Sequence, residues 1–232
     1  MKKINFFYLA LFALMSFATN LSKEKHPKKY AFSYLKNNSN VYNSLDSNNF
    51  QLPKEESFSK ALEGYYLLKS KGFIKKEFLT IIDFSLSSSI KRMWIIDMNQ
   101  NKIILNSLVA HGKNSGEEYA EDFSNLNQSN KSSLGFFLTG ETYNGKHGLS
   151  LKLDGLEKGI NDNARKREVV VHGADYVSES FINNNKRLGR SQGCPAVPVE
   201  LSKKIIETIK NKSCMFIYHP SKDAIQSSKL IS

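Results

Sequence analysis

Apolar residues at helical spacing predict one amphipathic helix near residues 55–71. Apolar side chains recur there every three or four positions, after Pro53 and a pair of glutamates and before Gly72. Proline suits the first turn of a helix, carboxylates complement the free N–H groups of that turn, and glycine commonly follows the last turn. We interpret the aromatic residues of this stripe as core packing rather than as a ligand platform.

After residue 72 the pattern changes to short apolar and β-branched runs, which are typical of strands. The turn-forming residues 98–101 join two of these runs as a hairpin, and the polar residues 110–135 are expected to form a long loop. A second helix is expected near 199–210. Short strands joined by long loops predict a mainly β fold of the sandwich or barrel type. The expected strands cover residues 78–84, 91–97, 102–109, 136–139, 149–153, 169–172 and 215–218.

The first residues follow another pattern. Lys2 and Lys3 precede an apolar run that ends at Met15, and small residues stand at positions 16 and 18. This order is typical of a secretory signal peptide, and the run is shorter than the roughly 20 apolar residues that span a membrane. We expect residues 1–18 to be removed, which leaves no transmembrane anchor and places the mature chain in the periplasm or at the cell wall. A retained membrane anchor is the alternative.

Composition indicates the number of domains and the net charge of the protein. The 232 residues are 40% apolar and 24% charged, which suits one globular domain with at most a helper segment. The formal net charge of +11 falls to +9 when Lys2 and Lys3 leave with the signal peptide. A basic protein is drawn to polyanions, and nucleic acid is scarce outside the cell, so peptidoglycan or an anionic surface is the expected partner. The sequence carries no dinucleotide or P-loop fingerprint, and no cofactor is expected.

The chain has two cysteines, and their surroundings differ. In an exported protein the simplest interpretation is a disulfide between them. Cys214, however, opens an apolar run, whereas Cys194 follows Gly193 in a glycine-containing loop that leads into the late helix. Gly193 would let the backbone approach a substrate closely, and the charge of Arg190 would favour a thiolate. Such a loop-to-helix junction is where an activated nucleophile is expected.

A histidine at the end of a strand supplies the base that a cysteine nucleophile needs. The apolar run 169–171 ends at His172 and Gly173, which places an imidazole at the rim of the predicted strand. A single histidine of this kind is more often structural, but His172 and Cys194 together suggest a Cys–His dyad. The competing hypothesis is a metal site, and it lacks a Cys-x-x-Cys pair or a second closely spaced ligand. No metal is expected.

These residues carry a resemblance to a known family. The strand that ends at His172 and the Ser-Gln-Gly-Cys run at 191–194 resemble the catalytic signature of L,D-transpeptidases of the YkuD type. Residues 189–197 match the pattern GRSxGCPAV of one branch of that family, and several upstream stretches between 140 and 162 resemble the same branch. The resemblance covers residues 78–219 and extends more weakly back to 53. It implies a YkuD-like β-sandwich catalytic domain that is preceded by a helical N-terminal segment.

The resemblance also implies a reaction on peptidoglycan stem peptides. Cys194 would attack the carbonyl carbon of the third residue of a tetrapeptide, a diamino acid, and expel the terminal D-Ala. An amine of a neighbouring stem would then resolve the thioester to a 3→3 crosslink, or water would resolve it to a tripeptide. His172 would accept the thiol proton. Backbone N–H groups at Gly193 and Cys194 would hold the oxyanion, and Ser191 and Gly173 would support the loop. The group that orients His172 stays open, with a backbone carbonyl as one candidate.

One departure from the family pattern concerns substrate binding. Many relatives have Ser-His-Gly-Cys followed by an apolar residue and then Arg or Asn, whereas here Gln192 replaces the histidine and Pro195 follows the cysteine. A donor carboxylate would then be held otherwise, by Arg190 or Arg167. The identity of the diamino acid and the oligomeric state remain open. Three further residues are expected to line the cleft, namely Tyr143, His111 and His147.

Three hypotheses of function follow. The first is a murein L,D-transpeptidase, a cysteine acyltransferase. The second is an L,D-carboxypeptidase or another peptidoglycan hydrolase that uses the same dyad. The third is a non-enzymatic, basic protein that binds the cell wall and carries a Cys194–Cys214 disulfide. The expected segments are a signal peptide (1–18), a lead-in with the amphipathic helix (19–77), the catalytic domain (78–221) and a C-terminal tail (222–232).

Overall fold

One sheet of eight strands carries the fold. The computed structural model describes residues 38–221 and 228–231. The strand order is β3-β2-β1-β8-β4-β5-β6-β7, and neighbours are antiparallel except for the parallel pairs β1–β8 and β6–β7. The predicted mainly β fold is confirmed. The strands are β1 (Phe78–Asp83), β2 (Met93–Asp97), β3 (Lys102–Ser107), β4 (Gly135–Gly145), β5 (Gly148–Gly155), β6 (Val170–Gly173), β7 (Ala196–Val197) and β8 (Cys214–Tyr218).

The two long helices lie where the hydrophobic pattern predicts them. These are α3 (Glu55–Ser70) and α5 (Val199–Ile209), and a short helix α2 (Asn38–Asn43) precedes them. Helix α4 (Glu179–Asn185) was not predicted, and none of its residues is buried. A helix without a buried face has no apolar stripe that could reveal it.

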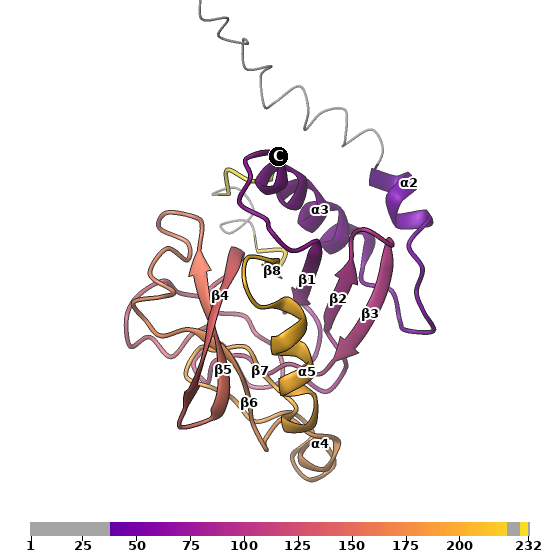
Figure 1. Cartoon of the computed structure of the whole chain (residues 1–232). Coiled ribbons are helices and arrows are strands. Elements are labelled where there is room, and N and C mark those ends of the chain that lie inside the picture. Colours follow the sequence, from indigo (N-terminus) through magenta and orange to yellow (C-terminus); the bar gives the residue numbers. More distant parts are fainter. Residues whose placement is uncertain (1–37, 222–227, 232) are drawn as a thin grey trace, which may run out of the picture.

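Two hydrophobic cores sandwich the sheet between α5 and α3. Met93 of β2 and Val171 of β6 share one core with Ile206 of α5, so the sheet curls around this helix. Figure 1 shows α5 in front of the sheet, between β1–β3 and β4–β5, and α3 above it. Phe58 of α3 packs in the other core against residues such as Ile81 of β1. Burial on both faces explains why β1 reads as a nearly continuous apolar run.

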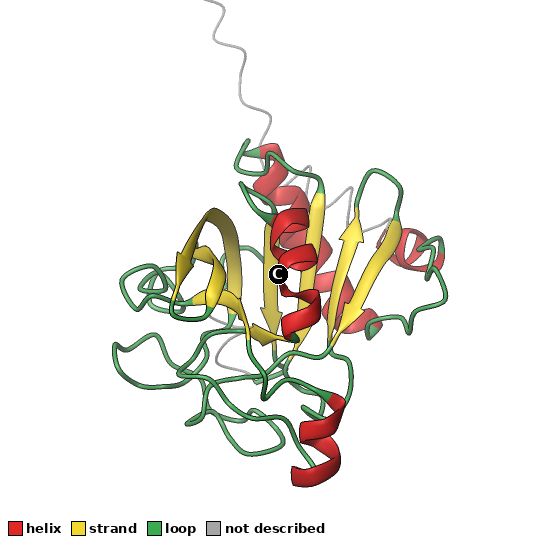
Figure 2. Cartoon of the chain, turned by 60° about the horizontal axis from the view of Figure 1, so that its bottom comes forward, coloured by secondary structure: helices red, strands yellow, loops and turns green. Residues whose placement is uncertain are grey.

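Strands β4 and β5 form a longer hairpin than the sequence predicts. They pair from Phe137↔Gly155 to Gly145↔Gly148, with a register shift between Thr139 and Thr142. The outer half of this hairpin is exposed, and its polar residues show no alternation of apolar side chains. The turn at 146–147 therefore lies at the exposed tip of the hairpin. Figure 2 shows that many of the loops gather at one end of the sheet.

Some predictions fall outside the described ranges. Residues 1–18, where the signal peptide is predicted, are not among them, and neither are residues 222–227 of the predicted tail. Within residues 38–221 and 228–231 no helix combines the length and apolar character that crossing a membrane requires. The domain boundaries stay a prediction.

Candidate active site

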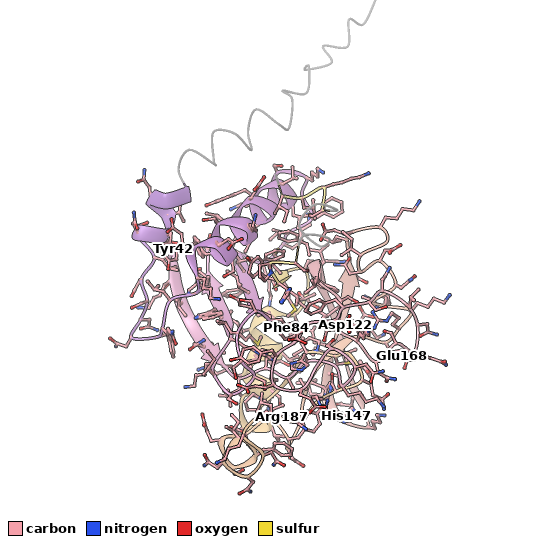
Figure 3. The ribbon with its side chains drawn as sticks, turned by 180° about the vertical axis from the view of Figure 1, so that it is seen from behind. Tyr42, Phe84, Asp122, His147, Glu168 and Arg187 are labelled. Carbon is pink, nitrogen blue, oxygen red and sulfur yellow. The ribbon has the colours of Figure 1, made fainter. Side chains whose placement is uncertain are left out.

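A cavity of about 740 Å³ gathers most of the predicted site residues. Its walls come from the β4–β5 hairpin, the segment before β6, β6 itself, the loop before β7 and the loop at 127–130. In Figure 3 the labelled residues His147 and Glu168 lie on the same side of the molecule. Gly193, Gly173 and His111 are not among the lining residues. Those predicted residues that do line the cavity are Cys194, His172, Ser191, Arg190, Arg167, Tyr143 and His147.

Cys194 lies beside the edge of β6. Its Sγ accepts a hydrogen bond from the backbone N of Val170 at 3.5 Å, and the thiol donates to the carbonyl oxygen of Glu168 at 3.7 Å. The parallel pairing of His172 with Ala196 explains this position, because Cys194 and Val170 each lie two residues before that pair. Side chains alternate along a strand, so Val170 and His172 face the cavity while Val171 faces the α5 core.

The surroundings of Cys194 favour the thiol over the thiolate. Burial raises the pKa of Cys194, and the Val170 N–H and the positive charges of Arg167 and Lys146 oppose this only in part. The structure therefore gives no support to the predicted stabilisation of a thiolate by Arg190. Desolvation outweighs the nearby cations, and Arg190 is not one of the charges that act on the sulfur.

The charge of Arg190 is neutralised by Glu117, a residue that does not line the cavity. Its Nη1 lies 2.6 Å from a carboxylate oxygen of Glu117 and 3.1 Å from the carbonyl oxygens of Lys113 and Gly116. The guanidinium thus ties the loop that carries the cysteine to residues 113–117. Arg190 lines the cavity, but its charge already has a partner.

His172 is positioned by the chain itself. The residue is only 3% exposed, and its Nδ1 lies 2.9 Å from the carbonyl oxygen of Gly173. Because a carbonyl only accepts, Nδ1 carries the proton, and Nε2 of the neutral ring has the free lone pair. Burial lowers the pKa of His172, and the nearby Lys146 and His147 lower it further. The result is a neutral imidazole that can act as a base in the cavity that Cys194 also lines.

The loop that carries Cys194 is braced by a serine and requires a glycine. Ser191 Oγ donates to the carbonyl oxygen of Cys194 at 2.6 Å and accepts the backbone N–H of Gly193 at 3.0 Å. Gly193 has a φ of +125°, and a Cβ there would lie 2.8 Å from the carbonyl oxygen of Lys131. Because its N–H is already bound, Gly193 is a poor oxyanion donor in this conformation. Among the described residues the N–H of Cys194 has no hydrogen-bond acceptor and is the better candidate.

Arg167 presents a positive charge to the cavity without a carboxylate partner in the described ranges. Its Nη1 donates to the carbonyl oxygen of Ser124 and to Ser133 Oγ. Its Nη2 donates to the carbonyl oxygen of Lys131 at 2.7 Å and to Ser129 Oγ at 3.2 Å. All four acceptors are neutral, so the charge is solvated but not cancelled. Of the two predicted arginines, only Arg167 keeps its charge available to a substrate.

His111 is a structural residue, which corrects its prediction as part of the cleft lining. It is 1% exposed, its Nδ1 accepts from Nη2 of the buried Arg92 at 2.8 Å, and Nε2 lies 3.2 Å from the carbonyl oxygen of Gly116. Burial, with the charge of Arg92, lowers the pKa of His111 to about 4. Its own carbonyl oxygen accepts the N–H of Ser191 at 2.9 Å, so His111 supports the back of the cysteine loop.

Sequence reasoning missed several residues of the cavity. Lys146 stands in the hairpin turn, where it is indistinguishable in the sequence from the other lysines. Glu168 precedes β6 with a φ of +56° and lines the cavity near the sulfur. A third group forms an amide-rich wall, made of Asn127, Gln128 and Asn130.

Both cysteines are free, so the predicted alternative of a Cys194–Cys214 disulfide is wrong. Cys214 is fully buried in β8 within the α3 core, where burial raises its pKa. Among the described residues no group of histidines, cysteines or carboxylates is arranged to hold a metal ion.

Comparisons with solved structures find similar chains of low identity. An L,D-transpeptidase from Mycobacterium smegmatis is similar at 10% identity over 62% of this chain and 59% of that chain, with a TM-score of 0.38. A fragment of the L,D-transpeptidase from Xylanimonas cellulosilytica gives 12% identity over 62% and 61%, with a TM-score of 0.34. An L,D-transpeptidase from Stackebrandtia nassauensis gives 14% identity over 80% of this chain and 91% of that chain, with a TM-score of 0.36. The matches to the first two cover less than two thirds of their length.

Two sequence comparisons complete the picture. Among curated proteins no significant match is found. A family profile described as the L,D-transpeptidase catalytic domain matches residues 51–218, which is well over half of the chain and includes helix α3 and the whole sheet. The chain therefore belongs to the family of the L,D-transpeptidase catalytic domain.

Proposed function

We propose that the protein is an exported murein L,D-transpeptidase that transfers a peptidoglycan stem peptide through a thioester on Cys194. Family membership over residues 51–218 supports the class of reaction. The observation that carries the residue assignment is that Cys194 and His172 line one cavity, with a backbone carbonyl on Nδ1 of the histidine. The signal peptide predicted at residues 1–18 supports export.

The first half-reaction begins from a neutral pair. Nε2 of His172 accepts the thiol proton as Sγ of Cys194 attacks the carbonyl carbon of the third stem residue. The bond from that carbon to the terminal D-Ala nitrogen then breaks, and the imidazolium gives its proton to the leaving amine. The raised pKa of Cys194 means that proton transfer accompanies attack, because little thiolate is present beforehand.

The developing oxyanion needs donors that are free before the substrate arrives. The backbone N–H of Cys194 meets this condition in the described part of the chain, whereas that of Gly193 is bound to Ser191. A preorganised donor of this kind contributes about 3 kcal/mol to the transition state. Ser191 therefore supports the reaction by bracing the loop at the carbonyl oxygen of Cys194 and at the N–H of Gly193.

The donor peptide carries carboxylates, and the cavity offers cations to bind them. Arg167 is the better candidate for a donor carboxylate because its acceptors are all neutral, and Lys146 faces the same cavity from the hairpin. Arg190 is the poorer candidate because Glu117 already neutralises it. A charge-assisted hydrogen bond to a carboxylate typically contributes about 1.5–3 kcal/mol.

The second half-reaction returns the enzyme to its starting state. An amine of a neighbouring stem attacks the thioester carbonyl, His172 accepts the proton of that amine, and the carbon–sulfur bond breaks. The sulfur recovers the proton from the imidazolium. The product is a 3→3 crosslink.

Two measurements on purified protein test this proposal. Exposure to a carbapenem should add one covalent adduct to the intact mass, which peptide mapping should assign to residue 194. Incubation with tetrapeptide muropeptides should give crosslinked dimers. Tripeptide alone would instead identify a hydrolase that uses the same pair.

Cysteine variants provide the matched control. Cys194→Ala should abolish both the adduct and the crosslinked product, while Cys214→Ala should retain them, because Cys214 is buried in the opposite core. Equal loss of acylation in both variants, each shown to be folded by its melting curve, would reject Cys194 as the nucleophile.

A further inference from the structure

His147 stacks on the ring of His172. The two ring centroids are 4.4 Å apart and the ring planes are inclined by 23°. His147 stands in the turn between β4 and β5, and β5 pairs with β6 so that Ser150 lies opposite His172. Strand pairing thus fixes the turn close to the histidine, and the contact is a consequence of the hairpin rather than of a free loop.

The exposed ring of His147 covers a nearly buried one. His172 is only 3% exposed, although its neighbours across the strands, Ser150 and Ala196, are small. The hydrogen bond from Nδ1 to the carbonyl oxygen of Gly173 fixes one atom of the ring and leaves its tilt open. The ring of His147, which stacks on one face of the His172 imidazole, restricts that tilt, as offset aromatic stacking does in other proteins.

The charged and titratable groups around His172 determine what else could affect its protonation. Ser150 and Ala196 on the paired strands do not titrate. The charged or titratable groups that share the cavity with His172 are Tyr143, Lys146, His147, Arg167, Glu168, Tyr176, Arg190 and Cys194. Of these, Lys146 and His147 on the hairpin act on His172 directly, and both oppose its protonation.

We propose that His147 is a positioning residue, which holds the imidazole of His172 by face-to-face stacking so that Nε2 can take the thiol proton, and shields this ring from water. The proposal rests on the proposed function. His147 acts through His172, and its role differs from the substrate contact expected for it from the sequence.

Three variants of the hairpin test the stacking. His147→Phe keeps an aromatic face over His172, His147→Ala removes it, and Asn144→Ala changes an exposed residue of the same hairpin that does not line the cavity. The rate constant for carbapenem acylation should fall about tenfold in His147→Ala, because small losses of alignment slow a reaction strongly. It should stay within about twofold of the unchanged protein in His147→Phe and Asn144→Ala.

The pH profile of acylation separates positioning from a general loss of stability. Attack requires neutral His172, so the rate falls at acid pH with the pKa of that residue. In His147→Ala the ring becomes more hydrated, which should move this acid limb to higher pH; in His147→Phe the limb should move less. An unchanged rate and limb in His147→Ala would overturn the proposal, and so would equal losses in the alanine and phenylalanine variants.

Titration of the labelled histidine rings by NMR distinguishes a failure of this inference from a failure of the proposed function. The His172 signal should titrate at higher pH in His147→Ala than in the unchanged protein, whether or not any acyl transfer is observed. An identical titration would show that the ring contact does not shield His172, even in an active enzyme.

Discussion

The burial of Cys194, which raises its pKa, predicts how the residue reacts with an alkylating reagent. The ordinary pKa of the thiol is 9.0, and burial raises it further. A thiol with such a pKa is less than about 1% ionised at pH 7. Because only the thiolate is alkylated, the rate constant for iodoacetamide at pH 7 should be below about one hundredth of its alkaline plateau.

The assay follows alkylation of residue 194 by peptide mapping from pH 5 to above pH 10, so that Cys214 does not contribute. The rate should rise with pH through a single limb above pH 9. A second arm uses Arg167→Gln, which removes a cation that lowers the pKa of the sulfur and should move the limb to still higher pH. A plateau already reached at or below pH 7 is typical of a thiolate–imidazolium pair and would refute the reasoning.

Three other predictions follow from single residues of the site. Gly193→Ala should lower the free energy of unfolding in urea by about 1–3 kcal/mol and slow acylation. The reason is that a Cβ at residue 193, where φ is +125°, would lie 2.8 Å from the carbonyl oxygen of Lys131. An unchanged free energy of unfolding and an unchanged acylation rate would contradict this close approach. Arg167→Lys should raise KM for the tetrapeptide about tenfold with a smaller change in kcat, because the amine keeps a charge but cannot make the four hydrogen bonds that hold the guanidinium at the cavity; a loss confined to kcat would argue against carboxylate binding. Between pH 6.5 and 4 His111 is protonated in the unfolded chain but neutral in the folded protein, so the free energy of unfolding should fall by up to about 3 kcal/mol as the pH falls through this range. Urea unfolding of His111→Gln should therefore depend less on pH than that of the unchanged protein. Parallel pH curves for the two proteins would exclude a contribution from His111.

Local patterns predicted the elements that bury one continuous face. Helix α3 and strand β1 could be recognised in the sequence because the apolar residues of each pack into a hydrophobic core along the whole element. The motif at 189–197 and the strand end at His172 likewise singled out Cys194 and His172, which line one cavity in the structure and which we propose as nucleophile and base. The outer part of the β4–β5 hairpin could not be predicted, because its side chains face solvent and follow no hydrophobic period.

The sequence by itself thus determined the mainly β class and the long helices, and it predicted the pair Cys194 and His172. Tertiary structure decided the partners of the predicted histidines and arginines: His111 turns inward to Arg92, Arg190 pairs with Glu117, and Arg167 has only neutral acceptors among the described residues. It also decided the burial that raises the pKa of Cys194. The physical reason is that periodicity and motifs are properties of neighbouring residues, whereas burial and the partners of a charge depend on segments that folding brings together from distant parts of the chain.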